Sequence, residues 1–232
     1  MSAPLILHIE TSTAVCSVAL SKGLQLLALK EDDEGRNHAR QLAVFIDEIL
    51  KEQQFAVSQL DAVSVSEGPG SYTGLRVGAS IAKGICYGAQ KPLIAVNSLQ
   101  SLACLAIENH LLPTNDCLIV PMIDARRMEV YTAVFDAFGK PVQATEAKII
   151  DAESFHALLT KHKLVFLGDG AEKCSNIIID ENAVFIALQA SASGMIKPAL
   201  AAFTRQQFVD TAYFEPFYLK DFVVSTVAKK KL

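Results

Sequence analysis

The amino-acid sequence predicts an α/β protein with two lobes, each built from a mixed sheet flanked by helices. The first part of the chain contains three short β-prone runs, at residues 5–10, 16–20 and 24–29, and turn residues separate them, which is typical of an antiparallel meander. Strand-like and helix-like segments then alternate over residues 37–109. The second half repeats this order in a shorter form. We therefore expect a first lobe over residues 1–112 and a smaller second lobe over residues 113–232.

Composition and charge narrow the classes of function. The chain has 232 residues, 51% of them hydrophobic, which is enough to bury a sizeable core. Charged residues interrupt its most apolar region, so we expect no membrane span, and the first ten residues lack the features of a signal peptide. Five scattered cysteines without a C-x-x-C pair favour buried, reduced thiols and a cytoplasmic location.

The net charge argues against a protein that binds nucleic acid without a partner. The formal net charge is −4, and the only basic run is the lysine triplet at 229–231. A protein that binds a phosphate backbone usually presents a basic face. If this chain acts on RNA, we expect another protein to hold most of that RNA.

The first helix is predicted over residues 37–53, after a charged segment at 31–35 that we interpret as a solvated loop. Its apolar residues recur at helical spacing, and small apolar neighbours widen the apolar arc beyond what packing on one sheet requires. One side of this helix is therefore a candidate contact surface for another molecule. The residues at this spacing are Leu42, Phe45, Ile46 and Ile49.

The second helix, predicted over residues 75–88, is more apolar still. Its polar residues share one narrow sector, and Ile81 and Ile85 lie close to glycines that would let another helix approach. Such a helix is either enclosed by its own chain or part of an interface. The residues alone favour neither of these two alternatives.

A glycine loop joins the strand predicted at residues 60–66 to this second helix. Residues 68–76 read Gly-Pro-Gly-Ser-Tyr-Thr-Gly-Leu-Arg, and Ser71 or Thr73 can cap the helix. Amides at a helix N-terminus favour an anion, so one interpretation is a phosphate cradle. The alternative is a sharp turn with close packing. The loop is neither a Walker A motif nor a G-x-G-x-x-G fingerprint.

The remaining elements complete the expected order. A strand at 93–96 leads to a helix capped by Asn97 or Ser98 and ending near residue 109, which is the order of an RNase H-like domain. The second half is predicted to contain a hairpin-like strand pair, a helix capped by Asp151, a strand, a glycine turn into a helix, and a helix that Pro198 breaks or kinks. Their ranges are 118–123 with 130–135, 151–161, 164–167, 168–171 and 191–207.

We find no residue pattern that predicts a catalytic or metal site. His38 is followed four positions later by Leu42, so it lacks a second ligand, and we assign it to the helix start or to an interface. Ser71 and Thr73 have no base nearby in the sequence, which argues against a nucleophile.

Acidic and basic residues near the middle of the chain leave two alternatives. Asp124 could hold a metal ion and Arg126 or Arg127 could bind phosphate, or these residues could form a salt bridge within a hairpin. We favour the salt bridge, because surface ion pairs of this kind are common. Asp169, between two glycines, is interpreted as a turn residue.

Four motifs resemble those of one family. The glycine loop is similar to a signature of the bacterial TsaB (YeaZ) proteins, which are partners in making threonylcarbamoyladenosine on tRNA. Ile-Glu-Thr-Ser at 9–12 and Asp-Ala-Arg-Arg-Met-Glu-Val-Tyr at 124–131 resemble two further marks of the family. Pro-Phe-Tyr-Leu-Lys at 216–220 resembles its C-terminal motif, with lysine in place of arginine.

This resemblance implies an actin-like ATPase (ASKHA) fold with two RNase H-like lobes. In sugar kinases and actin-like ATPases of this fold, the turn after the first strand lies against a nucleotide phosphate, and Glu10 takes the place of their metal-linked aspartate. By this analogy the chain carries a vestigial nucleotide site, although a hydroxyl-rich turn needs no ligand to explain it. Its residues would be Thr11, Ser12, Gly68, Gly70, Ser71, Thr73 and Gly74. We expect no bound cofactor and no metal.

The resemblance also implies a function. We expect a non-catalytic subunit that binds a TsaD-type enzyme and is required for threonylcarbamoyl transfer to the N6 of the adenosine beside the tRNA anticodon. TsaD proteins carry two histidines four apart, a pair that this chain lacks. A TsaE-type ATPase would join the two proteins, and tRNA would be contacted only indirectly. The expected partner-binding residues are His38, Leu42, Phe45, Ile46, Ile49, Ile81 and Ile85.

Three alternatives remain open from the sequence. The first is an ATP-dependent phosphotransferase of the same fold, which would use Thr11, Ser12 and the glycine loop. The second is a peptidase-like hydrolase. The third is a homodimer that forms through the same helical face when the partner is missing.

Overall fold

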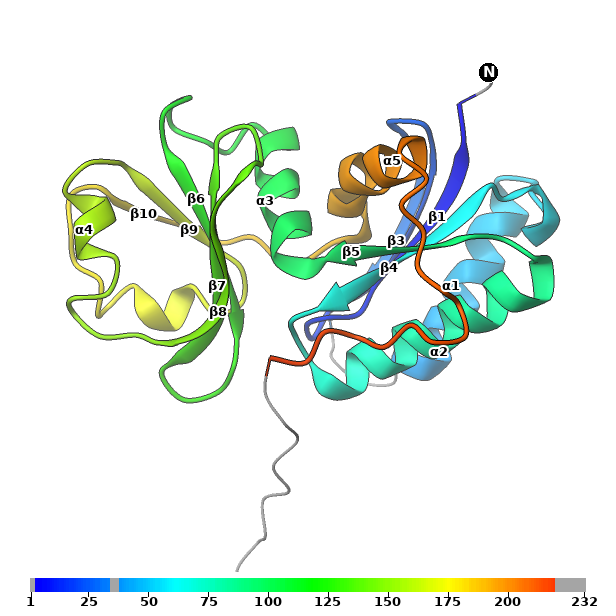
Figure 1. Cartoon of the computed structure of the whole chain (residues 1–232), viewed down its shortest axis with the longest axis horizontal. Coiled ribbons are helices and arrows are strands. Elements are labelled where there is room, and N and C mark those ends of the chain that lie inside the picture. The colour runs from blue at the N-terminus through cyan, green and yellow to red at the C-terminus, as the bar shows by residue number, and fades with distance from the viewer. Residues whose placement is uncertain (1–2, 34–37, 220–232) are drawn as a thin grey trace, which may run out of the picture.

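The computed structural model describes residues 3–33 and 38–219, and at His38 the backbone alone. Two sheets stand side by side, each with helices packed against it, and the chain passes from one lobe to the other and back (Figure 1). All five cysteines are buried and free, as the scattered spacing predicted. In the described ranges, every helix is too short or too polar to span a lipid bilayer.

The first sheet has the strand order β3-β2-β1-β4-β5. The first three strands form an antiparallel meander, and β4 and β5 add to β1 in parallel. Leu7 of β1 lies opposite Leu20 of β2 and Val63 of β4, which places apolar side chains together on one face. The strands are β1 (Leu5–Glu10), β2 (Cys16–Lys22), β3 (Gln25–Asp32), β4 (Ala62–Gly68) and β5 (Leu93–Asn97).

The second sheet repeats this topology. Its order, read from the other edge, is β8-β7-β6-β9-β10, again an antiparallel meander followed by parallel strands. The predicted actin-like ATPase fold with two RNase H-like lobes is confirmed. The sequence did not predict β8 or β10. The strands are β6 (Leu118–Asp124), β7 (Glu129–Asp136), β8 (Pro141–Ile149), β9 (Leu164–Leu167) and β10 (Ala183–Ile186).

The helices cover both faces of the first sheet. On one face, α1 and α2 pack against the apolar side chains of β1, β2 and β4. On the other face, the 3-10 helix η3 and α5 pack against Ile6, Ala19 and Ile94. Helix α3 packs against β6 and β9 and so links the two lobes. These helices are α1 (His38–Glu52), α2 (Tyr72–Ala89), α3 (Ser98–Glu108), η3 (Ala192–Met195) and α5 (Ile196–Thr204).

Several boundaries differ from the prediction. The helix expected at 151–161 is reduced to the single turn α4 (His156–Leu159), because Phe155 has a left-handed φ of 64° that interrupts it. The Asp151 carboxylate caps only the preceding turn, where it accepts hydrogen bonds from Glu153 N and Ser154 Oγ. The helix expected at 191–207 divides into η3 and α5, and Pro198 lies in the first turn of α5, where its missing N–H has no helical partner. The glycine turn after β9 leads to a 3-10 helix, η2 (Glu172–Cys174), rather than an α-helix.

The remaining difference concerns the charged segment after the meander. Glu31 and Asp32 extend β3 instead of forming a loop, and the rest of that segment lies largely outside the described residues. One further 3-10 turn, η1 (Val57–Gln59), separates α1 from β4. The lobe boundary near residue 113 stays a prediction.

The segment 208–219, here called the strap, returns to the first lobe and lies beside α2 (Figure 1). Val209 N donates to the carbonyl of Leu93 at 2.9 Å and extends the sheet edge by one bridge. Lys83 Nζ donates to strap carbonyls at 2.9 and 3.1 Å, and Phe217 N donates to Glu67 O at 2.6 Å. The strap is therefore tied to β4, α2 and β5, the elements around the glycine loop. Lys220 and the lysine triplet lie outside the described residues.

Candidate functional site

Two hydrogen bonds of Ser71 hold the glycine loop in place. Ser71 is the residue that caps α2, because its Oγ accepts a hydrogen bond from Gly74 N at 3.2 Å. Ser71 N donates to the carbonyl of Ser12 at 2.7 Å, which joins the loop to the turn after β1. The predicted strand, loop and helix are thus all present.

The loop packs closely on the turn that follows β1. A Cβ atom at Gly70 would lie 2.2 Å from Ser12 O, and one at Gly74 would lie 2.1 Å from Thr11 O. Any side chain at either position would force the two segments apart. The side chains of Thr11 and Ser12 are fully buried, so neither hydroxyl faces an open site. This geometry supports the close-packing interpretation of the glycines, and the phosphate interpretation stays a prediction.

Glu10 is fully buried at the carboxyl end of β1. Its Oε1 accepts a hydrogen bond from Ser12 N at 2.6 Å, and burial raises the pKa of its carboxyl above the ordinary value. Within the ranges that the structure describes, no group of three His, Cys, Asp or Glu side chains lies close enough to hold a metal ion.

A serine–histidine pair that the sequence analysis missed lies inside the first sheet. His8 Nδ1 is 2.7 Å from Ser64 Oγ, and its Nε2 is 2.8 Å from Ser21 Oγ. All three side chains are fully buried, and burial lowers the pKa of His8 to about 3. The pair therefore stabilises the core and cannot meet a substrate. Its only signal in the sequence is a histidine within an apolar strand, next to strands that contain serines.

The residues predicted to bind a partner divide into two groups. Leu42, Ile46 and Ile49 of α1 are buried in the core of the first lobe, because they face the apolar side of β1 and β2. They hold α1 on its own sheet and form no surface in the free chain. Phe45, Ile81 and Ile85 are half-buried and pack at the margin of that core. The side chain of His38, at the start of α1, lies outside the described part of the chain.

An exposed ridge lies on α2. Ser80, Gly84 and Gly88 recur at intervals of four residues and are exposed, and no heavy atom lies within 4 Å of the Cβ position of either glycine. Beside them Tyr87 is 85% exposed, although tyrosine side chains are usually more buried. On the neighbouring helix α1, Val44 is 45% exposed. We call Ser80, Gly84, Tyr87 and Gly88 the α2 ridge.

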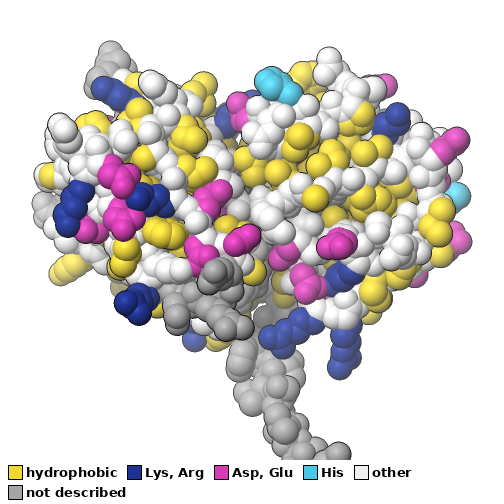
Figure 2. Space-filling view, turned by 180° about the vertical axis from the view of Figure 1, so that it is seen from behind, with side chains coloured by type: hydrophobic (Ala, Val, Ile, Leu, Met, Phe, Trp, Pro, Cys, Tyr) yellow, Lys and Arg dark blue, Asp and Glu magenta, His cyan; other side chains and the backbone are white. Residues whose placement is uncertain are grey.

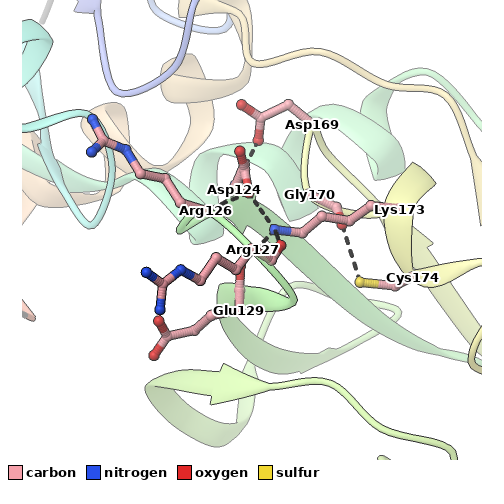
Figure 3. A network of polar contacts seen from close by, with 8 residues as sticks. All are labelled: Asp124, Arg126, Arg127, Glu129, Asp169, Gly170, Lys173 and Cys174. Carbon is pink, nitrogen blue, oxygen red and sulfur yellow. Dashed lines mark hydrogen bonds and ion pairs between the residues drawn. The ribbon is translucent and has the colours of Figure 1, made fainter. Parts of the chain in front are cut away.

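The turn between β6 and β7 forms a polar network (Figure 3). Asp124 forms an ion pair with Lys173 of η2, and not the hairpin salt bridge with arginine that we favoured. Asp124 Oδ1 also accepts from Arg126 N at 3.0 Å, and Asp124 N donates to Asp169 Oδ1 at 3.0 Å. Burial raises the pKa of Asp169. The sequence could not show Lys173 as the partner, because it comes from a distant element.

Two tyrosines and an arginine join the strap to the start of α2. The rings of Tyr72 and Tyr218 lie 5.0 Å apart between centroids, and the Arg76 guanidinium carbon lies 4.2 Å from the Tyr72 centroid. Arg76 Nε also donates to the Tyr218 hydroxyl at 3.3 Å. Tyr72 and Arg76 belong to the glycine loop motif, and Tyr218 belongs to the C-terminal motif. The two motifs therefore meet in space.

Comparison with known proteins identifies the family. A family model described as TsaD, tRNA N6-adenosine threonylcarbamoyltransferase, matches residues 32–229. The Escherichia coli protein described as tRNA threonylcarbamoyladenosine biosynthesis protein TsaB is 29% identical over 238 residues, which cover 98% of this chain and 97% of that protein. The chain belongs to the TsaB (YeaZ) family.

Further relatives of the TsaB (YeaZ) family agree with this placement. The Haemophilus influenzae protein of the same description is 40% identical over 126 residues, which are 54% of this chain and 51% of that protein. The match thus spans about half the length of that relative. The solved structure of YeaZ from Pseudomonas aeruginosa superposes with a TM-score of 0.80 at 27% identity, and the match covers 93% of this chain and 100% of that one.

Proposed function

We propose that this chain is a non-catalytic subunit required for threonylcarbamoyl transfer to the N6 of the adenosine beside the tRNA anticodon. It acts in the cytoplasm by binding and activating a TsaD-type enzyme, and a TsaE-type ATPase joins the pair. The descriptions of its relatives support a role in forming threonylcarbamoyladenosine, and the matching family model supports kinship with the transferase itself.

The observation that carries this proposal is the α2 ridge. Glycines inside a helix cost about 1 kcal/mol each relative to alanine, so two of them on an open helix face are unfavourable for the free chain. They allow another helix backbone to approach closely, and Tyr87 supplies the large aromatic side chain that interfaces favour. The ridge therefore fits a docking surface for a helix of the partner.

This assignment moves the centre of the proposed interface. The predicted residues Phe45, Ile81 and Ile85 are half-buried, so they contribute the margin of the surface, next to the ridge. Leu42, Ile46 and Ile49 contribute indirectly, since they hold α1 beside α2. A homodimer would use the same surface, and the enzyme would then compete with it.

The alternative functions have weaker support. A phosphotransferase would need the glycine loop to leave room for a nucleotide phosphate, whereas Gly70 and Gly74 lie against the backbone of Thr11 and Ser12. A peptidase-like hydrolase would need an accessible nucleophile and base, whereas the serine–histidine pair at His8 is enclosed in the core.

The test places a side chain on the ridge without disturbing the fold. Gly84→Glu adds a good helix former at a position whose Cβ is unobstructed, so the thermal unfolding temperature should stay the same or rise. Calorimetric titration with the purified TsaD-type protein should show affinity reduced about 10- to 100-fold, since overpacking costs about 1–3 kcal/mol. Ala201→Glu, at an exposed position of α5, is the matched control and should bind as the wild type does. Equal affinity of the Gly84→Glu chain and the wild type would contradict the proposal.

A further inference from the structure

Two adjacent arginines lie on the β6–β7 turn in an uncommon backbone conformation. Arg126 and Arg127 have φ angles of 70° and 53°, in the left-handed region that non-glycine residues seldom adopt. The turn is closed by hydrogen bonds from Ala125 N to Glu129 O at 3.1 Å and from Glu129 N to Arg126 O at 3.2 Å. Both arginine side chains are exposed. The turn therefore presents two arginine side chains from neighbouring positions of a fixed backbone.

The Lys173 side chain stabilises this turn through its Nζ atom. In addition to its ion pair with Asp124, Lys173 Nζ donates to Arg127 O and Glu129 O, each at 2.7 Å. One ammonium group thus satisfies two turn carbonyls and neutralises the nearest carboxylate. Because Asp124 is paired with Lys173 and accepts from the Arg126 amide, it does not neutralise the Arg126 guanidinium. Within the described residues, no ion pair of Arg126 or Arg127 is seen.

The Arg126 side chain points away from the network that fixes its backbone, and the Arg127 side chain lies beside Glu129 (Figure 3). In Figure 3 the Arg126 side chain extends toward the ribbon of the first lobe, and Arg127 extends outward above Glu129. Lys and Arg side chains project from the lower end of the second lobe (Figure 2). The glycine loop and the start of α2 lie at the same end of the molecule (Figure 1). Both arginine side chains are exposed, so a large anionic partner that spans this end can reach them.

We propose that Arg126 and Arg127 contact the phosphate backbone of the RNA substrate. This inference rests on the proposed function. Guanidinium groups bind phosphate oxygens with two parallel hydrogen bonds, and such contacts position the RNA without reading its bases. Because the net charge of the chain is −4, the pair supplies a local contact while the catalytic partner holds most of the RNA. This revises the expectation that tRNA is contacted only indirectly.

The test removes the two charges and keeps the backbone. Asparagine tolerates the left-handed region better than other non-glycine residues, so Arg126→Asn with Arg127→Asn should leave the turn and the unfolding temperature unchanged. Binding of fluorescent unmodified tRNA to the complex with the TsaD-type protein is measured by anisotropy between about 50 and 300 mM salt. We expect affinity to fall about 30-fold at about 0.1 M salt, and the slope of log K against log salt to decrease by about 1.4–1.8.

A control variant and a measurement with small anions keep the outcomes distinct. Lys161→Asn with Arg205→Asn removes two other exposed positive charges and should leave both affinity and slope close to the wild type. Equal loss in this control, or no loss in the arginine variant, would overturn the proposal. The proposal would also be overturned if the arginine variant lost binding to ATP or inorganic phosphate but still bound tRNA, because the ligand would then be a small anion.

The proposed function and the RNA contact can be tested separately. If the chain and the TsaD-type protein form no complex, the same anisotropy titration is made with the full chain alone at about 20 mM salt, where phosphate contacts are strongest. Weak tRNA binding that disappears in the Arg126→Asn, Arg127→Asn chain would support the contact, and its absence in the wild-type chain would refute it.

Discussion

The buried His8 predicts how stability depends on pH. In the unfolded chain a histidine has a pKa of about 6.5, whereas the pKa of His8 in the folded protein is about 3. On acidification the unfolded state therefore takes up the proton before the folded state does. The contribution of His8 is fully present above pH 6.5 and is lost as the pH falls toward 3.

The size of this effect follows from the two pKa values. At pH 5 the unfolded chain holds the His8 proton almost completely and the folded chain does not. The free energy of unfolding should then be about 2 kcal/mol lower than at pH 8 because of this single group. Burial raises the pKa of Glu10 and acts in the opposite direction, so that stability is lost as the pH rises. The effect of His8 is therefore measured by comparing the wild type with a chain that lacks this histidine.

The assay compares the wild type with His8→Gln. Urea unfolding followed by circular dichroism gives the free energy of unfolding at pH 8 and at pH 5 for both chains. The variant is less stable at pH 8, because Ser64 and Ser21 lose well-placed partners, but its loss between pH 8 and pH 5 should be about 2 kcal/mol smaller. The exposed His162→Gln should keep the wild-type dependence. If the His8→Gln chain loses as much stability on acidification as the wild type, the histidine is not held neutral in the core.

The remaining predictions concern the glycines and the β6–β7 turn. Gly74→Ala should lower the free energy of unfolding by about 1–3 kcal/mol, because its Cβ would lie 2.1 Å from Thr11 O, whereas Gly84→Ala should raise it by up to about 1 kcal/mol. Urea unfolding of both variants tests the pair, and a loss at Gly84 as large as at Gly74 would contradict the packing account. Lys173→Met should cost about 1–3 kcal/mol, since Asp124 and two carbonyls lose their shared donor, and the Arg126 amide should exchange faster with deuterium. Unchanged exchange would show that Lys173 does not hold the turn.

Much of the fold could be predicted because local signals agree with the tertiary structure. The strands β1 and β9 have the predicted bounds, and the glycine loop joins a strand to a capped helix as expected. Strand β8 has no such signal, because it is an exposed edge strand without an apolar alternation. Its place is set by pairing with β7, which is a tertiary contact.

The candidate sites show where sequence reasoning ends. Helical spacing identified the apolar residues of α1 correctly, but the same spacing serves a helix packed on its own sheet, and Leu42 and Ile49 are fully buried there. The docking surface we propose is marked instead by Gly84 and Tyr87, whose exposure depends on how α2 lies on the sheet. Likewise Lys173 reaches Asp124 only because η2 follows the strand that pairs with β6.

The most direct test of the docking surface is a footprint of the complex. Tyr87 and Ile179 are each 85% exposed in the free chain, the first on the α2 ridge and the second on the other lobe. Hydroxyl-radical labelling with mass spectrometry measures how fast each side chain is modified, with and without the TsaD-type protein. We predict that modification of Tyr87 slows at least about 5-fold, as expected for a residue buried at the centre of an interface, while that of Ile179 is unchanged. An unchanged rate at Tyr87 in a complex that has formed would contradict the account.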